Sequence, residues 1–147
     1  MRFSCSHQVV IAVPPAAVYD YLADPCRWPE WHPASHHIDA PGRPLARGER
    51  FDERWRIRRG EIHLRWQVTA SDRPGFWAIV AETDFIGPIV GEYRFEAVPG
   101  GTRYTRTLVN PDRAEPPTPA QLAAIDDEAR LCLANTRARL EAAVRHG

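Results

Sequence analysis

The chain has 147 residues, 44% hydrophobic and 26% charged, which is the composition of an ordinary globular protein rather than a disordered or fibrous one. This length suits one domain with one core, and we expect residues 1–147 to form a single domain. The 19 basic and 19 acidic residues cancel, so the chain has no overall field that would attract phosphates, and we expect no nucleic-acid partner.

The cysteines and the N-terminus indicate the compartment. Cys5, Cys26 and Cys132 are odd in number and share no metal-ligand spacing, so we expect free thiols. The first residues lack the apolar core of a signal peptide, and no run of about 18 apolar residues could span a bilayer. The sequence therefore predicts a cytoplasmic protein without a membrane span.

The N-terminal part reads as a strand followed by two short helices. Residues 3–13 alternate between apolar and polar, the period of a half-buried strand. A proline at the first helical position then favours a helix over residues 15–23. Asp24 can cap a second helix that begins at Pro25, and Pro29 ends it after about one turn.

From Ser35 to Gly101 the chain reads as strands separated by turns that contain Gly or Pro. This spacing predicts hairpins of an antiparallel sheet. Alternation places the large side chains on one face of each strand. They are Phe51, Glu53, Trp55 and Ile57, then Ile62, Leu64, Trp66 and Val68, then Tyr93, Phe95 and Ala97, and finally Tyr104, Arg106 and Leu108.

A long helix is predicted from Pro119 to about Arg145, because Thr118 and Gln121 form a capping box at its start. Its apolar stripe consists of Leu122, Ile125, Ala129, Cys132, Leu133, Thr136, Leu140 and Val144, and Glu128 falls on the polar side. This stripe can be buried only against the concave face of the sheet. We therefore predict an α+β helix-grip fold, in which a curved antiparallel sheet of about seven strands surrounds the C-terminal helix, with two short helices after the first strand.

Two local motifs carry a family resemblance. One runs from Val13 to Asp24 and continues through Trp28, Pro29, Trp31, His32 and Pro33, and the other is Gly101-Thr102-Arg103. With the order of elements, they resemble the START-like or Bet v 1-like superfamily (SRPBCC), and within it the polyketide cyclase/dehydrase and lipid-transport group. The resemblance implies a cavity for a hydrophobic ligand, seldom a catalytic triad, and functions that range from cyclisation to carriage.

Large side chains around a bent sheet leave an apolar cavity beside the helix, which is the usual constitution of a small-molecule site. We predict that it binds a hydrophobic or aromatic small molecule, such as a polyketide or lipid. The predicted ligand-binding residues are Trp55, Leu64, Trp66, Tyr93, Phe95, Tyr104, Arg106, Ile125, Ala129, Leu133 and Thr136. For the tryptophans, core packing is the stronger reading, and Trp28 and Trp31 are expected to wedge the short helix against the sheet.

Glu53 and Arg106 are charged residues on predicted inward faces. They can pair with each other, or Arg106 can bind a carboxylate or enolate oxygen of the ligand, with Tyr93 or Tyr104 donating beside it. A second hypothesis is an enzyme of the cyclase/dehydratase kind without metal. Glu53 would abstract a proton next to a carbonyl, and Arg106 or a tyrosine would stabilise the enolate.

We expect neither a metal nor a cofactor. His36 and His37 are adjacent on a predicted strand and point to opposite faces, so only one of them could join His32, and no third ligand is evident. We expect these histidines at the surface or as caps. Motifs for phosphate loops, dinucleotides and zinc proteases are missing from the sequence.

Two surface features remain. Arginines around Gly60, including Arg59, alternate with acidic residues and indicate a solvated hairpin rather than an anion site. Leu131 lies with Ala134, Ala138 and Ala142 on a thin second stripe of the long helix. We favour exposed surface for this stripe; a homodimer contact, or a protein-interaction module that uses the grip as a docking groove, is the alternative.

Overall fold

The computed structural model describes residues 1–58 and 60–146, and within them seven strands, two α-helices and one short 3-10 helix follow one another. The order is β1 (Phe3–Ile11), α1 (Pro15–Leu22), η1 (Pro25–Glu30), β2 (Ser35–Asp39), β3 (Arg50–Ile57), β4 (Gly60–Asp72), β5 (Phe76–Glu82), β6 (Ile89–Val98), β7 (Gly101–Asn110) and α2 (Pro119–His146). This confirms the predicted sequence of elements and the helix-grip fold.

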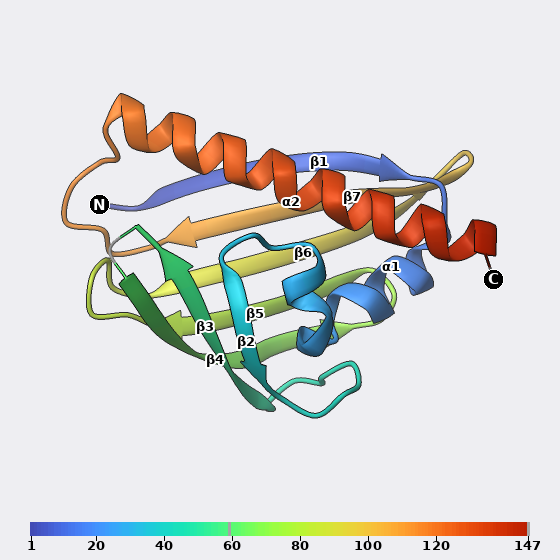
Figure 1. Cartoon of the computed structure of the whole chain (residues 1–147), viewed down its shortest axis with the longest axis horizontal. Coiled ribbons are helices and arrows are strands. Elements are labelled where there is room, and N and C mark those ends of the chain that lie inside the picture. Colours follow the sequence, from blue (N-terminus) through green and yellow to red (C-terminus); the bar gives the residue numbers. More distant parts are fainter. Residues whose placement is uncertain (59, 147) are drawn as a thin grey trace.

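The strands form one antiparallel sheet in the order β1-β7-β6-β5-β4-β3-β2, so β1 and β2 are its edges. The sheet is curved, and α2 runs along β1 on its inner side (Figure 1). The short helix α1 contacts β6 and β7, and η1 contacts β2. The concave face is therefore covered by three helices, and the core and any interior site lie between them and the sheet.

The predicted helix starts are present. The Oδ1 atom of Asp24 accepts a hydrogen bond from the backbone N–H of Cys26 at 3.1 Å and so caps η1. At the start of α2, Thr118 Oγ1 accepts from the N–H of Gln121 at 3.1 Å, and Gln121 Oε1 accepts from the N–H of Thr118 at 2.9 Å. This reciprocal pair confirms the capping box.

The Gly101-Thr102 motif ties β7 to the end of β1. A side chain at position 101 would collide with the backbone of Ile11 and Ala12, so only glycine permits this approach. The Thr102 hydroxyl donates to the carbonyl of Val13 at 2.7 Å. Because Val13 precedes α1, this motif fixes where the first helix leaves the sheet.

The apolar stripe of α2 is buried in its middle and exposed at its ends. Ala129, Cys132, Leu133, Thr136 and Leu140 are buried, and Ile125 is half-buried. The prediction was wrong for Leu122 and Val144, which are 44% and 62% exposed. At about 1.5 Å per residue the 28-residue helix is about 42 Å long, whereas the nine residues of β1 span about 31 Å, so the strand cannot cover the whole length of the helix. Among the described residues, no helix has the length and apolarity to cross a membrane.

The surface features lie where they were expected. Arg54, Arg58 and Arg65 are exposed, and Arg54 pairs with Glu61 at 2.9 Å, whereas Arg59 lies outside the described residues. In the second stripe of α2, Leu131 is 47% exposed and the three alanines are exposed too. A homodimer through this stripe stays a prediction.

Candidate functional site

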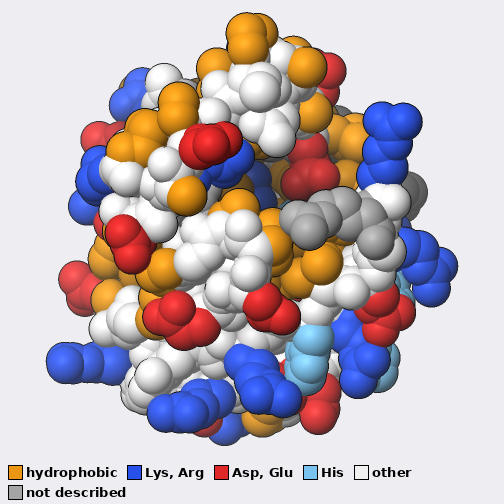
Figure 2. Space-filling model, turned by 90° about the vertical axis from the view of Figure 1, so that its left-hand side faces the viewer, with side chains coloured by type: hydrophobic (Ala, Val, Ile, Leu, Met, Phe, Trp, Pro, Cys, Tyr) orange, Lys and Arg blue, Asp and Glu red, His pale blue; other side chains and the backbone are white. Residues whose placement is uncertain are grey.

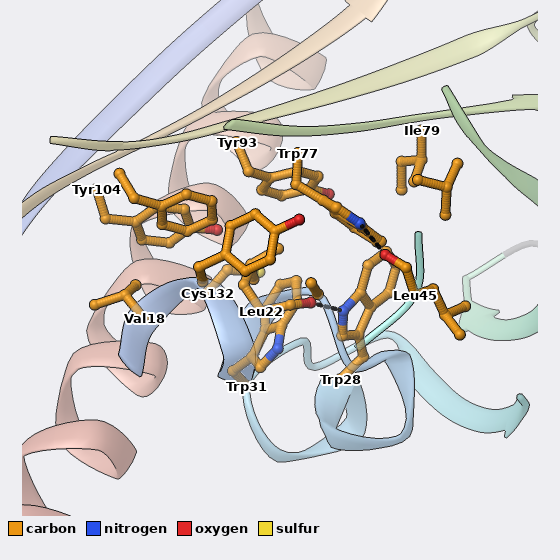
Figure 3. Close-up of a cluster of buried hydrophobic side chains, with 14 of the residues drawn as sticks. Val18, Leu22, Trp28, Trp31, Leu45, Trp77, Ile79, Tyr93, Tyr104 and Cys132 are labelled. Carbon is orange, nitrogen blue, oxygen red and sulfur yellow. Dashed lines mark hydrogen bonds between the residues drawn. The ribbon is translucent and has the colours of Figure 1, made fainter. Parts of the chain in front are cut away.

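Trp28 fills one part of the concave face. It is 2% exposed, and its ring centroid lies 5.3 to 6.4 Å from those of Trp31, Phe51, Trp66, Trp77 and Tyr93. Its indole N–H donates to the carbonyl of Leu22 at 2.9 Å, which fixes η1 to the end of α1. Figure 3 shows Trp28 from η1, and Trp31 directly after it, facing Tyr93 and Trp77 from the sheet. This part of the interior is a packed aromatic core, as expected for these two tryptophans.

Polar and charged side chains occupy the neighbouring part of the interior. Glu53 on β3 is 0% exposed and Arg106 on β7 is 5% exposed, so both face inward as predicted. The two charges attract each other, yet no ion pair joins them in the described part of the chain, and both keep an atom without a hydrogen-bond partner. The alternative of a direct Glu53–Arg106 pair is therefore not what the structure contains.

The two carboxyl oxygens of Glu53 differ in their hydrogen bonding. Its Oε1 accepts a hydrogen bond from the Trp66 indole at 2.9 Å, whereas Oε2 has no partner. Burial raises the pKa of Glu53, because desolvation disfavours the charged carboxylate. Ser35, Trp66 and Trp55 act as hydrogen-bond donors toward the carboxyl group and, with the charge of Arg106, partly offset this effect. Of these three donors, Trp66 alone makes a hydrogen bond of full geometry. Glu53 is therefore a carboxyl group poised to hold or release a proton inside the protein.

Arg106 lies among aromatic and weakly acidic groups. Its guanidinium is 5.8 Å from the centre of the Trp31 ring, a cation–π contact. Burial works to lower the pKa of Arg106, whereas attraction to Glu128 and to the anionic forms of Tyr93, Cys132 and Tyr104 raises it. At pH 7 the two tyrosines and the thiol are uncharged, so they compensate the burial of the guanidinium little there, although the group itself stays protonated. Since Nε has no hydrogen-bond partner, a charged donor is available in the interior.

The two tyrosines beside Arg106 remain protonated. Burial raises the pKa of Tyr93 to about 12 and also raises the pKa of Tyr104 well above its usual value. Gly91 precedes Tyr93 on the same face of β6, and a Cβ there would lie 3.0 Å from the Tyr93 hydroxyl oxygen. Glycine at this position therefore leaves room for the Tyr93 ring to fold back over the strand. Tyr104 stacks on Phe95 with ring centroids 5.5 Å apart, and its hydroxyl has no partner.

His32 is buried, so of its two expected roles, at the surface or as a cap, the surface position is wrong. It is 3% exposed, and its Nδ1 accepts a hydrogen bond from the backbone N–H of Ala34 at 3.1 Å. Burial and the charge of Arg106 lower the pKa of His32 to about 3, so the ring is neutral and carries its proton on Nε2. Its Nε2–H is thus a fixed donor. The described residues contain no cluster of three metal-ligating side chains.

Seven buried polar atoms of this region have no hydrogen-bond partner within the described residues. They are Trp31 Nε1, His32 Nε2, Ser35 Oγ, Glu53 Oε2, Trp55 Nε1, Tyr104 Oη and Arg106 Nε. Four of the seven are N–H groups that can only donate, and two are hydroxyls that can do either. Chemically, a set of atoms with this excess of donors can satisfy oxygen acceptors.

Every predicted ligand-binding residue faces the interior. Trp55 and Ile125 are half-buried and the rest are buried: Leu64, Trp66, Tyr93, Phe95, Tyr104, Arg106, Ala129, Leu133 and Thr136. That these residues bind a ligand stays a prediction. The sequence analysis did not assign His32, Ser35, Cys132 and Glu128 to the site. The stripe position of Cys132 gave a signal, whereas His32 lies in the loop between η1 and β2, about which strand alternation carries no information.

Glu128, predicted on the polar side of the helix, lies at the edge of that side and also reaches the interior. Its side chain is 44% exposed and Oε1 lies 3.7 Å from Nε2 of the buried His32. The reason is that η1 and the residues after it rise toward this turn of α2, so a residue beside the apolar stripe still meets the interior. Burial accordingly raises the pKa of Glu128, and Arg106 lowers it in part.

The molecular surface is hollowed near the start of α2. Figure 2 shows hydrophobic side chains over the first turns of this helix and, below them, a recess with apolar, acidic and basic side chains on its walls. A separate open depression of about 1770 Å³ follows β3 to β5 and includes Asp52, Arg65 and Glu82. It contains none of the residues with unpartnered interior atoms, so the candidate site is the polar cluster between sheet and α2.

Comparisons with known proteins agree with this architecture. The profile of the family described as polyketide cyclase/dehydrase and lipid transport matches residues 2–141. The chain is 29% identical over 133 residues to penitrem biosynthesis cluster 1 protein I of Penicillium ochrochloron, and the match covers 85% of this chain and 86% of the relative.

Two solved structures show the same Bet v 1-like fold. The Zhui aromatase/cyclase from Streptomyces sp. R1128 is 17% identical, with a TM-score of 0.78 over 98% of this chain and 96% of its own. Ara h 8.0201 is 11% identical, with a TM-score of 0.73 over 97% of this chain and 99% of its own. At these identities the likeness concerns the fold alone, and it confirms the resemblance drawn from the sequence.

Proposed function

The chain belongs to the polyketide cyclase/dehydrase and lipid transport family, and from this premise we propose that it binds an oxygenated aromatic or apolar small molecule between its sheet and α2. In this proposal Arg106 donates to an acidic or carbonyl oxygen of the ligand, with Tyr104 and His32 donating beside it. The surrounding tryptophans and the stripe of α2 contact its apolar frame.

The group of unpartnered polar atoms around Arg106 carries the proposal. Leaving a buried donor or acceptor unsatisfied costs about 1 to 3 kcal/mol, and more for a charged group. A packed core needs no such groups, because apolar side chains of similar shape would be more stable. A ligand that satisfies several donors at once recovers this cost on binding, which gives the cluster a purpose that packing alone does not. The excess of donors favours a ligand rich in oxygen acceptors over a plain alkyl chain.

A matched pair of fluorescent probes tests the proposal. Anilinonaphthalene sulfonate carries a permanent negative charge, and phenylnaphthylamine has the same aromatic frame without it. We expect both to bind the folded protein. Arg106→Met should weaken the binding of the sulfonate by about 30-fold, equivalent to about 2 kcal/mol, and change the affinity of the neutral probe by less than about twofold.

Two results would contradict the proposal. One is that neither probe binds the folded protein. The other is that Arg106→Met changes the affinity of both probes equally, which would show that the guanidinium does not contact the charged group of the ligand. If the probes bind as expected, extraction of the purified native protein with organic solvent, followed by mass spectrometry, would identify the natural ligand.

A cyclase/dehydratase reaction is the second candidate, and the buried carboxyl of Glu53 is the observation that favours it. A carboxylate whose pKa is raised is a stronger base, and it could take a proton from carbon next to a carbonyl. The enolate oxygen would accept hydrogen bonds from Arg106 or Tyr104. In that case Glu53→Gln should abolish turnover of a β-carbonyl substrate while the neutral probe still binds. Turnover that survives this substitution excludes Glu53 as the base.

A further inference from the structure

Glu128 lies at the boundary between the polar cluster and solvent. Its neighbour Ala129 is buried at the seam between helix and sheet, whereas the Glu128 side chain is 44% exposed. Its Oε1 is 3.7 Å from Nε2 of His32, inside the cluster. One turn further along the helix, on the same face, is the buried Cys132. This turn of α2 therefore covers the part of the interior that contains Arg106, whose charge reaches both residues.

The charges of Glu128 and Arg106 act on each other across a gap. Arg106 lowers the pKa of Glu128 against the effect of burial, and Glu128 in turn helps to raise the pKa of Arg106. No ion pair joins them in the part of the chain that is described, so the guanidinium keeps its Nε–H for another acceptor. An anionic ligand oxygen bound to Arg106 would consequently lie close to a carboxylate of the same sign.

We propose that Glu128 sets the charge selectivity of the site, by weakening the binding of anionic ligands at Arg106 while leaving neutral ligands unaffected. The inference rests on the proposed function, because it requires the ligand to lie beside Arg106. It also narrows the ligand class. Neutral carbonyl and phenol oxygens can satisfy the donors without repulsion from Glu128, whereas a carboxylate or sulfonate cannot.

The size of the effect follows from Coulomb's law. Two like charges separated by several ångströms at an effective dielectric constant of about 20 repel enough to change an affinity by about tenfold or more. Partial exposure of Glu128 allows water and salt to screen part of this repulsion. We therefore expect an effect of about tenfold at low ionic strength that becomes smaller as salt is added.

The test compares Glu128→Gln with Asp127→Asn, using the same two probes. Asp127 is the preceding residue of α2, and it is exposed, so its variant makes the same change in net charge outside the site. We expect Glu128→Gln to bind anilinonaphthalene sulfonate about tenfold more tightly than the wild type and phenylnaphthylamine within about twofold. Asp127→Asn should bind both probes as the wild type does.

The possible failures are distinguishable. If Arg106→Met weakens the binding of the sulfonate but Glu128→Gln leaves that binding unchanged, the inference about Glu128 is wrong and the proposed binding site stands. Equal tightening by Asp127→Asn would also overturn it, because the effect would then come from net charge. If Glu128→Gln tightens the binding of both probes alike, the inference is also wrong, because a neutral probe feels no charge repulsion from Glu128. If neither probe binds the wild type, the proposed function fails and the inference fails with it.

Discussion

Replacing Arg106 with methionine should make the protein more stable, at the expense of its affinity for anions. The guanidinium is 5% exposed, and its Nε has no partner among the described residues. Taking a cation out of water costs several kcal/mol even after relaxation. The cation–π contact with Trp31 returns about 1 to 2 kcal/mol, and attraction to Glu53 and Glu128 across a gap returns a similar amount.

Methionine fills a comparable volume with apolar atoms and removes both the cost and these partial compensations. We expect a net gain of about 1 to 2 kcal/mol in the free energy of unfolding at pH 7, or a rise of about 2 to 8 °C in Tm for a chain of this length. Urea denaturation without ligand, followed by far-UV circular dichroism, measures it. Far-UV detection avoids the change in tryptophan fluorescence that loss of the Trp31 contact would cause.

Arg94→Met is the matched control. Arg94 is exposed on β6 and its guanidinium lies 4.6 Å from the centre of the Phe76 ring, so it shares the cation–π contact but not the burial. Its variant should change stability by less than about 1 kcal/mol. A loss of more than about 1 kcal/mol in Arg106→Met would refute the reasoning, because it would mean that the protein itself satisfies the guanidinium. The double variant with Glu53→Gln would then be expected to recover stability, as for a buried pair removed whole.

Three further outcomes follow from the geometry. The pKa of His32 is lowered to about 3 in the folded protein, so the unfolded chain binds one more proton between that pH and about 6.5, and the free energy of unfolding should fall by up to about 1.4 kcal/mol per pH unit as the pH decreases through this window. Urea titrations at several pH values should show that His32→Asn loses this pH dependence. An unchanged pH dependence would contradict a neutral buried His32. Ala129→Glu should lower the free energy of unfolding by about 3 kcal/mol or more, because it buries a carboxylate between helix and sheet, whereas Ala134→Glu on the exposed side should change it by less than about 0.5 kcal/mol. Equal Tm values for the two variants would show that the assigned face of α2 is wrong. Gly91→Ala should destabilise the protein by about 1 to 3 kcal/mol and displace the Tyr93 ring, with a weaker response to the neutral probe; wild-type stability and binding would mean that the ring does not need this space.

The sequence alone determined the order of the elements and the faces of the strands. Alternation with period two is a local property of an extended chain, so it placed Glu53 and Arg106 inside without knowledge of their surroundings. The capping residues of η1 and α2 act within a few positions of one another, and they too could be read directly. The fold then followed, because a long amphipathic helix can bury its stripe only on the concave face of such a sheet.

The residues of the site are brought together by contacts between distant segments, and such contacts leave no periodic pattern in the sequence. Nothing local indicates that the residues after η1 bring His32 under α2 at Glu128, because this depends on how the short helix packs against the sheet. The same holds for the ends of α2, where Leu122 and Val144 fit the apolar stripe but remain exposed, because the strand is shorter than the helix. Only the tertiary structure decided whether Arg106 meets a carboxylate, since a residue's face is set by the strand that carries it, whereas its partners are set by the distances between elements far apart in the chain.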